Sequence, residues 1–199
     1  MIPPSLRPLA RRLRRLPDRL LHPARRRAAG RALARVGPPQ RVLFVCHGNI
    51  CRSPYAAAVA RRLLPPAVAV ESAGLIGPDR PSPPEAVAVA AERGIDLGPH
   101  RSQLIDFEHV REVDLVVVMD TRQRHRLLRA RHELRGRVVL LGDLDPEPVA
   151  TRAVPDPVEQ PAEVFRACYD RIDRCIGALA ASWRTAGGED AQEQGGKLE

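Results

Sequence analysis

A short segment near residue 50 combines the residue types that bind and attack phosphate. It reads Cys46-His-Gly-Asn-Ile-Cys-Arg-Ser53, with a cysteine and an arginine six positions apart. An ionised cysteine is a strong nucleophile, and the planar fork of an arginine can hold two oxygens of a phosphoryl group. The segment therefore predicts Cys46 as a nucleophile and Arg52 as the group that holds an anion in front of it.

The spacing alone is weak evidence, because the pair Cys168 and Arg174 repeats it. The second pair lies in a helical pattern with two aspartates between its members, where a phosphate would be repelled. The first pair follows an apolar run and precedes a helical pattern, so backbone N–H groups and the positive end of a helix would face one concavity. Such surroundings lower a cysteine pKa, and we expect Cys46 to be mostly thiolate.

Three further residues of the segment suit the same site. Gly48 is expected to let the backbone turn and approach a ligand closely. The Ser53 hydroxyl can donate a hydrogen bond to a thiolate, and the Asn49 amide can tie down the backbone of the loop. From these residue types alone a structural interpretation also stays open, with Cys46 as a small buried hydrophobe and Ser53 as a helix N-cap.

The elements that must position this segment alternate between strand and helix. Four apolar runs predict strands, at residues 41–45, 68–70, 114–119 and 137–141. Helical patterns are expected at residues 53–64, 85–93, 121–132 and 162–183. Alternation of this kind predicts an α/β fold, here a four-stranded parallel sheet with helices on both faces and the reactive segment after its first strand.

Length and composition limit the possible classes of protein. The 199 residues are 44% hydrophobic and 28% charged, which suits one well-buried globular domain. No run of 18 apolar residues is present, so a membrane-spanning helix is not expected. Four cysteines without a secretion signal favour the reducing cytoplasm, where a reactive cysteine is more often catalytic than structural.

The net charge of +8 belongs to a basic arm, residues 1–40, which carries eleven arginines and one acid. Its leucine spacing predicts one helical piece that ends at Pro17 and a second from about residue 23 to 36. The arm suits an anionic membrane surface or an acidic partner, and a solvated or self-packed extension is an equal alternative. Nucleic acid fits less well without aromatic residues. The polar tail, residues 185–199, is expected to be disordered.

The reactive segment resembles the phosphate-binding loop of low-molecular-weight protein tyrosine phosphatases, in the run Val45-Cys-His-Gly-Asn-Ile-Cys-Arg-Ser-Pro54. Further similarity follows in family order at Glu71-Ser-Ala-Gly74, Gly94-Ile-Asp96, His100-Arg-Ser102, Asp114 through Asp120 and Val154-Pro-Asp-Pro157. The resemblance covers residues 41–184. It implies hydrolysis of phosphomonoesters, most of all protein phosphotyrosine, through a phosphocysteine on Cys46 and without metal or cofactor.

The family takes its general acid from a late Asp-Pro pair, which matches Asp156, whereas Asp145 offers a second Asp-Pro in the same long loop. Ser72 and His100 are implied as partners of Asn49. The rest of the loop is assigned to substrate binding: His47, Gly48, Asn49, Ile50, Cys51 and Ser53. Similar enzymes can also close a reversible disulfide between the positions of Cys46 and Cys51.

The sequence departs from the family where an aromatic side chain usually walls the phosphotyrosine ring. Val158 follows the late Asp-Pro, and residues 75–84 contain no aromatic. Ring stacking is therefore expected to be weaker, with His47 and Ile50 lining the mouth. Relatives that hydrolyse phosphoarginine tend to carry threonine at the position of Ile50, which argues against that substrate.

Other functions are less well supported. An arsenate reductase on the same loop would need a downstream cysteine relay, and no cysteine lies between Cys51 and Cys168. A zinc site built from all four cysteines would have to neutralise the loop thiolate. A phosphate-binding protein that docks through its basic arm is the alternative from another class.

Overall fold

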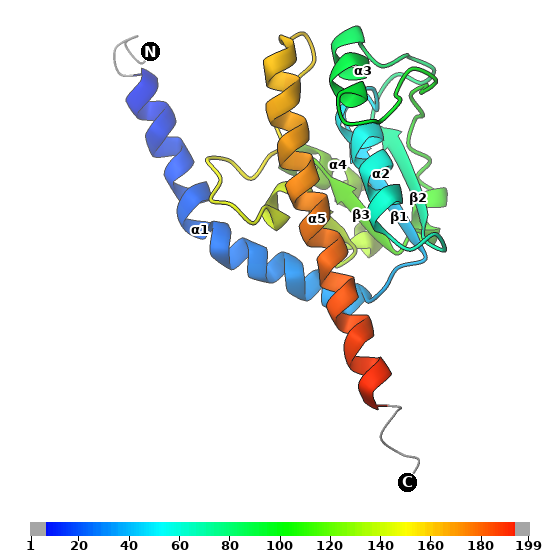
Figure 1. Cartoon of the computed structure of the whole chain (residues 1–199). Coiled ribbons are helices and arrows are strands. Elements are labelled where there is room, and N and C mark those ends of the chain that lie inside the picture. Colours follow the sequence, from blue (N-terminus) through cyan, green and yellow to red (C-terminus); the bar gives the residue numbers. More distant parts are fainter. Residues whose placement is uncertain (1–6, 194–199) are drawn as a thin grey trace.

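The computed structural model describes residues 7–193 and confirms the α/β fold (Figure 1). Its four strands are all parallel and lie in the order β2-β1-β3-β4. They are β1 (Arg41–Cys46), β2 (Ala69–Gly74), β3 (Leu115–Val118) and β4 (Val138–Leu140). Each predicted strand corresponds to one of these, and β2 runs four residues further than its apolar run indicated.

Helices cover both faces of the sheet, as the sequence predicts (Figure 1). One face packs against α2 (Arg52–Leu63), α3 (Pro84–Ala91) and α5 (Ala162–Glu193). The other face packs against α4 (Thr121–Ala130). Residues 42–45 of β1 are all apolar because both faces of the strand are buried. Val42 and Phe44 enter the first core, and Leu43 and Val45 enter the second.

The strand order creates a switch point at the carboxyl end of β1. The chain leaves β1 and builds β2 on one side of it, then returns to build β3 on the other. Ligands of open α/β sheets bind in the crevice at such a point. Cys46 is the last residue of β1, so the fold places it there.

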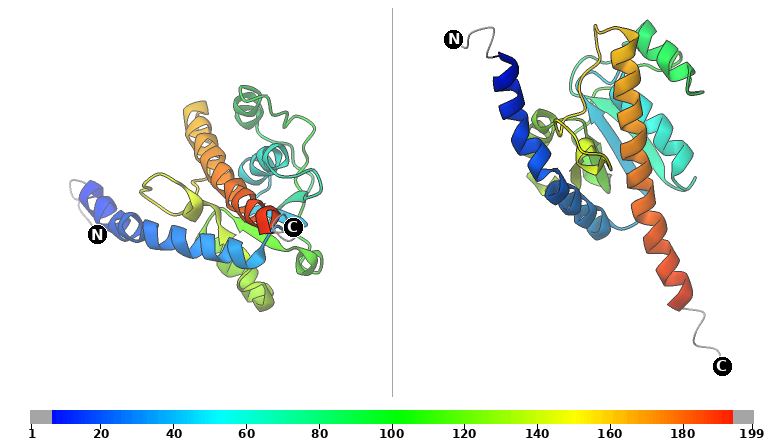
Figure 2. Two further views of the ribbon diagram at one scale, coloured as in Figure 1. Left: turned by 60° about the horizontal axis from the view of Figure 1, so that its bottom comes forward. Right: turned by 60° about the vertical axis from the view of Figure 1, so that its left-hand side comes forward.

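The basic arm forms one helix, α1 (Arg7–Val36), so the expectation of two separate helical pieces is wrong. Pro17 and Pro23 both lie inside it. A proline removes one backbone hydrogen bond and kinks a helix, and α1 bends partway along its length in both views of Figure 2. The prolines therefore bend the helix without ending it.

The arm packs against the domain. Ala29 and Leu33 are buried in the same core as α5. The buried His22 ring contacts the Asp145 carbonyl oxygen through Nε2 at 2.9 Å, and the Asp18 carboxylate accepts a hydrogen bond from the Arg152 N–H at 3.2 Å. The part of α1 from Asp18 onward is thus attached to the long loop between β4 and α5.

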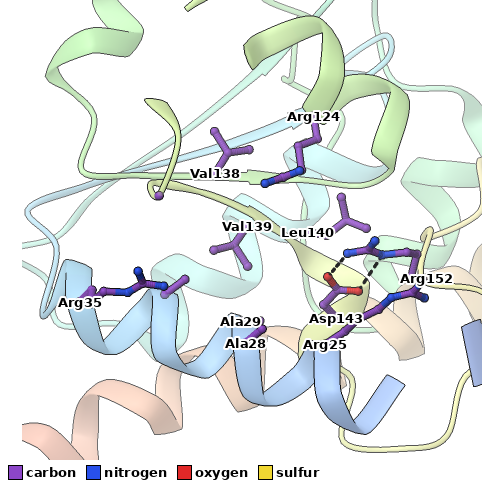
Figure 3. A pocket seen from close by; sticks show the side chains of 12 residues that line it. Arg25, Ala28, Ala29, Arg35, Arg124, Val138, Val139, Leu140, Asp143 and Arg152 are labelled. Carbon is purple, nitrogen blue, oxygen red and sulfur yellow. Dashed lines mark hydrogen bonds and ion pairs between the residues drawn. The ribbon is translucent and has the colours of Figure 1, made fainter. Parts of the chain in front are cut away.

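A basic pocket of about 280 Å³ lies between α1 and β4 (Figure 3). Arg25 and Arg35 line it from α1, Arg124 lines it from α4, and Arg152 pairs with Asp143 at its edge. Ala28, Ala29, Val138 and Val139 supply apolar lining. The arm therefore adds positive charge to the β4 edge of the sheet.

Helix α5 continues ten residues past Trp183, to Glu193, where the sequence predicted its end and a disordered tail. Each further residue of a growing helix adds one hydrogen bond, and Ala, Glu and Gln of this stretch are good helix formers. The remaining residues of that tail lie outside the described part of the chain. Between residues 7 and 193, no helix is long and apolar enough to cross a membrane.

Candidate active site

The loop between β1 and α2, residues 46–52, surrounds a buried cysteine sulfur with hydrogen-bond donors. Cys46 is only 2% exposed. The backbone N–H of Asn49 and the hydroxyl of Ser53 each donate a hydrogen bond to Cys46 Sγ, both at 3.1 Å. Two donors that converge on one sulfur stabilise its negatively charged form. The loop therefore directs two hydrogen-bond donors at the Cys46 sulfur.

Asn49 keeps the loop in this shape. Its φ of 52° lies in the left-handed region, which asparagine tolerates better than most residues. Its side-chain Nδ2 donates to Ser53 Oγ and to Ser72 Oγ, both at 2.9 Å, and its Oδ1 accepts from the Gln103 N–H at 2.8 Å. The fully buried amide thus ties the loop to β2 and to the segment that follows α3.

His100 contacts the same residue from another direction. Its Nε2 lies 2.7 Å from the carbonyl oxygen of Asn49. The structure therefore places both residues that the resemblance linked to Asn49, Ser72 and His100, in contact with it. Gln103 joins them through its backbone, a contact that no side-chain pattern in the sequence could indicate.

Arg52 opens α2 and is 3% exposed. Its Nη1 donates to the Val154 carbonyl oxygen at 3.1 Å, and its Nη2 forms an ion pair with the Asp156 carboxylate. Its Nε is one of the few buried polar atoms without a hydrogen-bond partner within the described residues. A buried guanidinium with an unused donor beside a cavity suits an incoming oxyanion.

The two Asp-Pro pairs of the long loop have different surroundings. Asp156 is partly exposed and faces Arg52 at the cavity. Asp145 is fully buried and accepts hydrogen bonds from Arg171 Nε at 3.0 Å and Arg174 Nε at 3.2 Å. Only Asp156 can meet a substrate, whereas Asp145 holds the loop to α5.

A cavity of about 80 Å³ lies above the sulfur, with no aromatic side chain in its lining. Its lining residues are Cys46, His47, Gly48, Ile50, Cys51, Arg52, Ile76, Arg80, Asp156 and Val158. His47 and Ile50 line this cavity, together with the apolar side chains of Ile76 and Val158. Every member of the sequence-predicted loop except Asn49 and Ser53, which hold it from below, lines this space.

Arg80 was not predicted from the sequence, and its side chain lies over the 46–52 loop. Its Nη2 donates to the Gly48 carbonyl oxygen at 3.0 Å, and its Nε donates to the Gly77 carbonyl oxygen at 3.2 Å. A Cβ on Gly48 would lie 2.5 Å from Arg80 Nη2. Gly48 therefore makes room for this guanidinium, and its backbone does not adopt a positive φ.

Gly74 at the end of β2 allows a second close approach. A Cβ there would lie 2.9 Å from the Gly48 carbonyl carbon and 3.0 Å from the Asn49 nitrogen. Backbone atoms cannot move aside as a flexible side chain can. The glycine of the Glu71-Ser-Ala-Gly74 run is therefore needed for β2 to lie against the loop.

The other three cysteines are buried free thiols. Burial raises the pKa of Cys51, and the neighbouring Cys46 raises it further. Burial also raises the pKa of Cys168 and of Cys175, each to about 12. These thiols stay protonated near neutral pH. No group of three or more His, Cys, Asp or Glu that could hold a metal ion occurs among the described residues.

A sulfur below a small cavity, a guanidinium beside it and a carboxyl group at its edge are what phosphoryl transfer to cysteine requires. The fold and this arrangement define the class of cysteine-dependent phosphatases. Residues 41–188 match the family described as low molecular weight phosphotyrosine protein phosphatase, and the chain belongs to that family. It is thus a cysteine-dependent protein tyrosine phosphatase by family.

Individual relatives agree with this assignment. The low molecular weight protein-tyrosine-phosphatase Wzb of Escherichia coli (strain K12) is 38% identical over 136 residues, which cover 67% of this chain and 88% of Wzb. A crystal structure of the tyrosine phosphatase Wzb from Escherichia coli K30 in complex with sulphate has a TM-score of 0.66 and 30% identity, and covers 72% of this chain and 97% of that one. The YwlE arginine phosphatase from Geobacillus stearothermophilus has a TM-score of 0.68 and 31% identity, over 76% of this chain and 97% of that one.

Proposed function

We propose that Cys46, Arg52 and Asp156 hydrolyse phosphotyrosine in protein substrates through a phosphocysteine intermediate. The observation that carries the proposal is the convergence of the Asn49 N–H and the Ser53 hydroxyl on Cys46 Sγ. These donors hold a sulfur anion at the floor of a cavity whose wall is the Arg52 guanidinium. A cysteine that only packs in the core would need neither of these hydrogen bonds.

In the first step the sulfur of Cys46 attacks phosphorus. The S–P bond forms while the bond from phosphorus to the tyrosine oxygen breaks, and the leaving oxygen takes a proton from the Asp156 carboxyl group. Arg52 holds the equatorial phosphoryl oxygens as charge develops. In the structure Arg52 pairs with Asp156, and an entering phosphoryl group takes over that guanidinium and leaves the carboxyl group near the leaving oxygen.

In the second step water replaces the cysteine. The Asp156 carboxylate accepts a proton from the attacking water, the S–P bond breaks, and inorganic phosphate leaves. The sulfur departs as an anion, so the Asn49 and Ser53 donors stabilise the charge that develops on it in this step. Asp156 ends the cycle protonated and ready for the next substrate.

The first test is rapid-mix hydrolysis of para-nitrophenyl phosphate by the reduced protein. We expect a burst of nitrophenol from the wild type, and no burst and no turnover from Cys46→Ser. A wild type that does not hydrolyse para-nitrophenyl phosphate would overturn the enzyme proposal and favour the alternative of a phosphate-binding protein. Retained turnover in Cys46→Ser would overturn the role of Cys46.

Phosphoarginine is a second candidate substrate, because the YwlE arginine phosphatase aligns over nearly its whole length. The side chain of Ile50 lines the cavity and offers no hydrogen-bond donor or acceptor to a guanidinium. We therefore favour phosphotyrosine. Competition between matched phosphotyrosine and phosphoarginine peptides decides the choice, and Ile50→Thr is expected to shift the preference toward phosphoarginine.

We also propose that the enzyme works in the reducing cytoplasm and that its arm meets an anionic membrane surface or an acidic partner. The mechanism needs reduced Cys46, and α1 exposes Leu20 and Leu21 beside the exposed Arg19 and Arg26. Sedimentation with phosphatidylserine vesicles, compared with phosphatidylcholine vesicles, tests the membrane. Binding that Leu20→Ser with Leu21→Ser does not weaken would overturn the contact through these leucines.

A further inference from the structure

A second hollow adjoins the catalytic cavity on the side of α4. It has a volume of about 470 Å³ and shares His47, Arg52 and Asp156 with the catalytic cavity. Arg122 and Arg126 of α4 line its far side. A group attached to a substrate in the catalytic cavity can therefore reach this hollow without leaving the surface.

The two arginines lie on one face of α4, because residues four apart in a helix are neighbours. Both are exposed, and neither has an ion pair or a side-chain hydrogen bond with another described residue. Arg131, just after the same helix, instead pairs with Glu108. Arg122 and Arg126 therefore present two free guanidinium groups to the hollow.

The acidic groups of the hollow already have partners. Asp120 caps the start of α4, and its two carboxylate oxygens accept hydrogen bonds from the Gln123 N–H at 2.8 Å and from Gln123 Nε2 at 2.9 Å. Asp156 pairs with Arg52. The positive end of the α4 dipole adds to the charge of the arginines. Three arginines, Arg52, Arg122 and Arg126, face two carboxylates in the lining, so the hollow keeps a net positive charge, and the capping box holds its wall in place.

We propose that this hollow is a substrate subsite that takes a second anionic group, a carboxylate or a phosphate, on a residue next to the phosphotyrosine. The inference rests on the proposed phosphatase function and adds a substrate class to it. Arg122 and Arg126 hold the second group, and Arg52 holds the phosphoryl group that is hydrolysed. Preferred substrates are then acidic or multiply phosphorylated segments.

Exposed ion pairs each contribute about 0.2–1 kcal/mol, so two arginines are expected to favour an acidic peptide by roughly 2- to 30-fold in kcat/KM. The gain depends on charge, and added salt should reduce it. A phosphate carries more charge than a carboxylate and accepts more hydrogen bonds, so the phosphorylated neighbour should gain more.

The test compares three phosphotyrosine peptides that differ at one neighbouring residue: alanine, glutamate or phosphoserine. The measured quantity is the ratio of kcat/KM for each anionic peptide to kcat/KM for the alanine peptide. This ratio cancels any change in the shared chemical step. We expect the wild type to prefer both anionic peptides, and Arg122→Gln with Arg126→Gln to bring both ratios close to one.

Arg129→Gln is the matched control, because Arg129 is exposed on the same helix and does not line the hollow. It should keep the wild-type ratios. Equal ratios in the wild type, or a preference that survives in the double variant, would overturn the subsite. A wild type that hydrolyses neither para-nitrophenyl phosphate nor any peptide would instead overturn the proposed function. Preference for one anionic peptide only would identify that anion as the ligand.

Discussion

The Ser53 hydroxyl donates a hydrogen bond to Cys46 Sγ and accepts one from Asn49 Nδ2. The amide uses an oxygen lone pair, so the single hydroxyl hydrogen stays available to Cys46 Sγ at 3.1 Å, with the Ala73 carbonyl oxygen at 3.4 Å as the more distant acceptor. Asn49 in turn is anchored by Ser72 and by the Gln103 backbone. The sulfur is therefore held by a connected network and not by one isolated donor.

Replacing Ser53 by alanine removes the side-chain donor to the sulfur. A hydrogen bond to a charged group contributes about 1.5–3 kcal/mol, which corresponds to roughly a 10- to 150-fold loss of rate. Because the sulfur leaves as an anion in the second step, we expect Ser53→Ala to keep a nitrophenol burst and slow the steady state. Rapid mixing followed by steady-state recording measures both.

Ser82→Ala is the control for that variant. Ser82 is also buried, and its hydroxyl has no hydrogen-bond partner within the described residues. Its removal should leave both phases unchanged. Equal steady-state rates for Ser53→Ala and Ser82→Ala would contradict the assigned role of Ser53.

Asp156→Asn should slow the chemistry in a way that depends on the leaving group. General acid catalysis contributes roughly 10²- to 10⁴-fold, and a phenolate that leaves easily needs the proton least. We expect a larger loss with phosphotyrosine than with para-nitrophenyl phosphate. The loss is measured in kcat/KM, which reports the step that expels the leaving group, and an equal loss of kcat/KM with both substrates would argue against a proton donor.

Asp145→Asn separates this role from the stability of the loop. Asp145 is fully buried between Arg171 and Arg174, and breaking a buried ion pair costs about 3–5 kcal/mol of unfolding free energy. This variant should unfold at lower urea concentration, whereas Asp156→Asn, at a partly exposed position, should not. If Asp145→Asn stayed as stable as the wild type and showed the larger loss with phosphotyrosine, Asp145 would be the general acid and Asp156 the residue that holds the loop.

The 46–52 loop could be predicted from the sequence because its residues are contiguous and lie between a strand and a helix. The strands were predictable for a related reason, since burial on both faces of a parallel sheet makes runs such as Val116, Val117 and Val118 wholly apolar. Asp156 could be proposed only through family order, because 104 positions separate it from Arg52. Contacts of this range leave no local pattern.

The cavity-lining residues that could not be predicted from the sequence are arginines. Arg80, Arg122 and Arg126 belong to a set of 31 arginines, and the direction of each side chain depends on tertiary packing. Local rules also failed in α1, where Pro17 and Pro23 predicted an interruption. The buried contacts of Ala29 and Leu33 hold the helix against the domain, and tertiary packing outweighs the local preference.

Gly48→Ala should act through Arg80. The added methyl group would lie 2.5 Å from Arg80 Nη2, and this flexible end would move away and lose its bond to the Gly48 carbonyl oxygen. Arg80→Ala removes the same charge from the cavity. We expect each single variant to lower kcat/KM about fivefold, since one partly exposed charge contributes about 1 kcal/mol.

The double variant tests whether the two changes share one cause. Residues in contact give non-additive effects, so Gly48→Ala with Arg80→Ala should resemble Arg80→Ala alone. Arg101→Ala is the control, because Arg101 is exposed and its guanidinium donates to backbone carbonyls of its own segment. Additive losses in the double variant would show that Gly48 matters for another reason.

The attachment of α1 should weaken in acid through Asp18. Burial raises the pKa of this carboxyl group, but its hydrogen bonds from Arg25 and from the Arg152 N–H outweigh burial and leave the pKa below its usual value. A carboxyl group whose pKa is lower in the folded state stabilises that state above its ordinary pKa of about 3.9. The stabilisation is lost as pH falls through the lower folded-state value.

Urea unfolding of the wild type and of Asp18→Asn, at pH values above and below the ordinary aspartate pKa, measures this contribution. The wild type should be more stable at neutral pH, and the two curves should converge in acid. Arg25→Gln removes the stronger donor and should shrink the difference without altering Asp18 itself. A gap between wild type and Asp18→Asn that stays constant down to the lowest pH would show that the carboxylate charge does not hold α1 to the loop that carries Arg152 and Asp156.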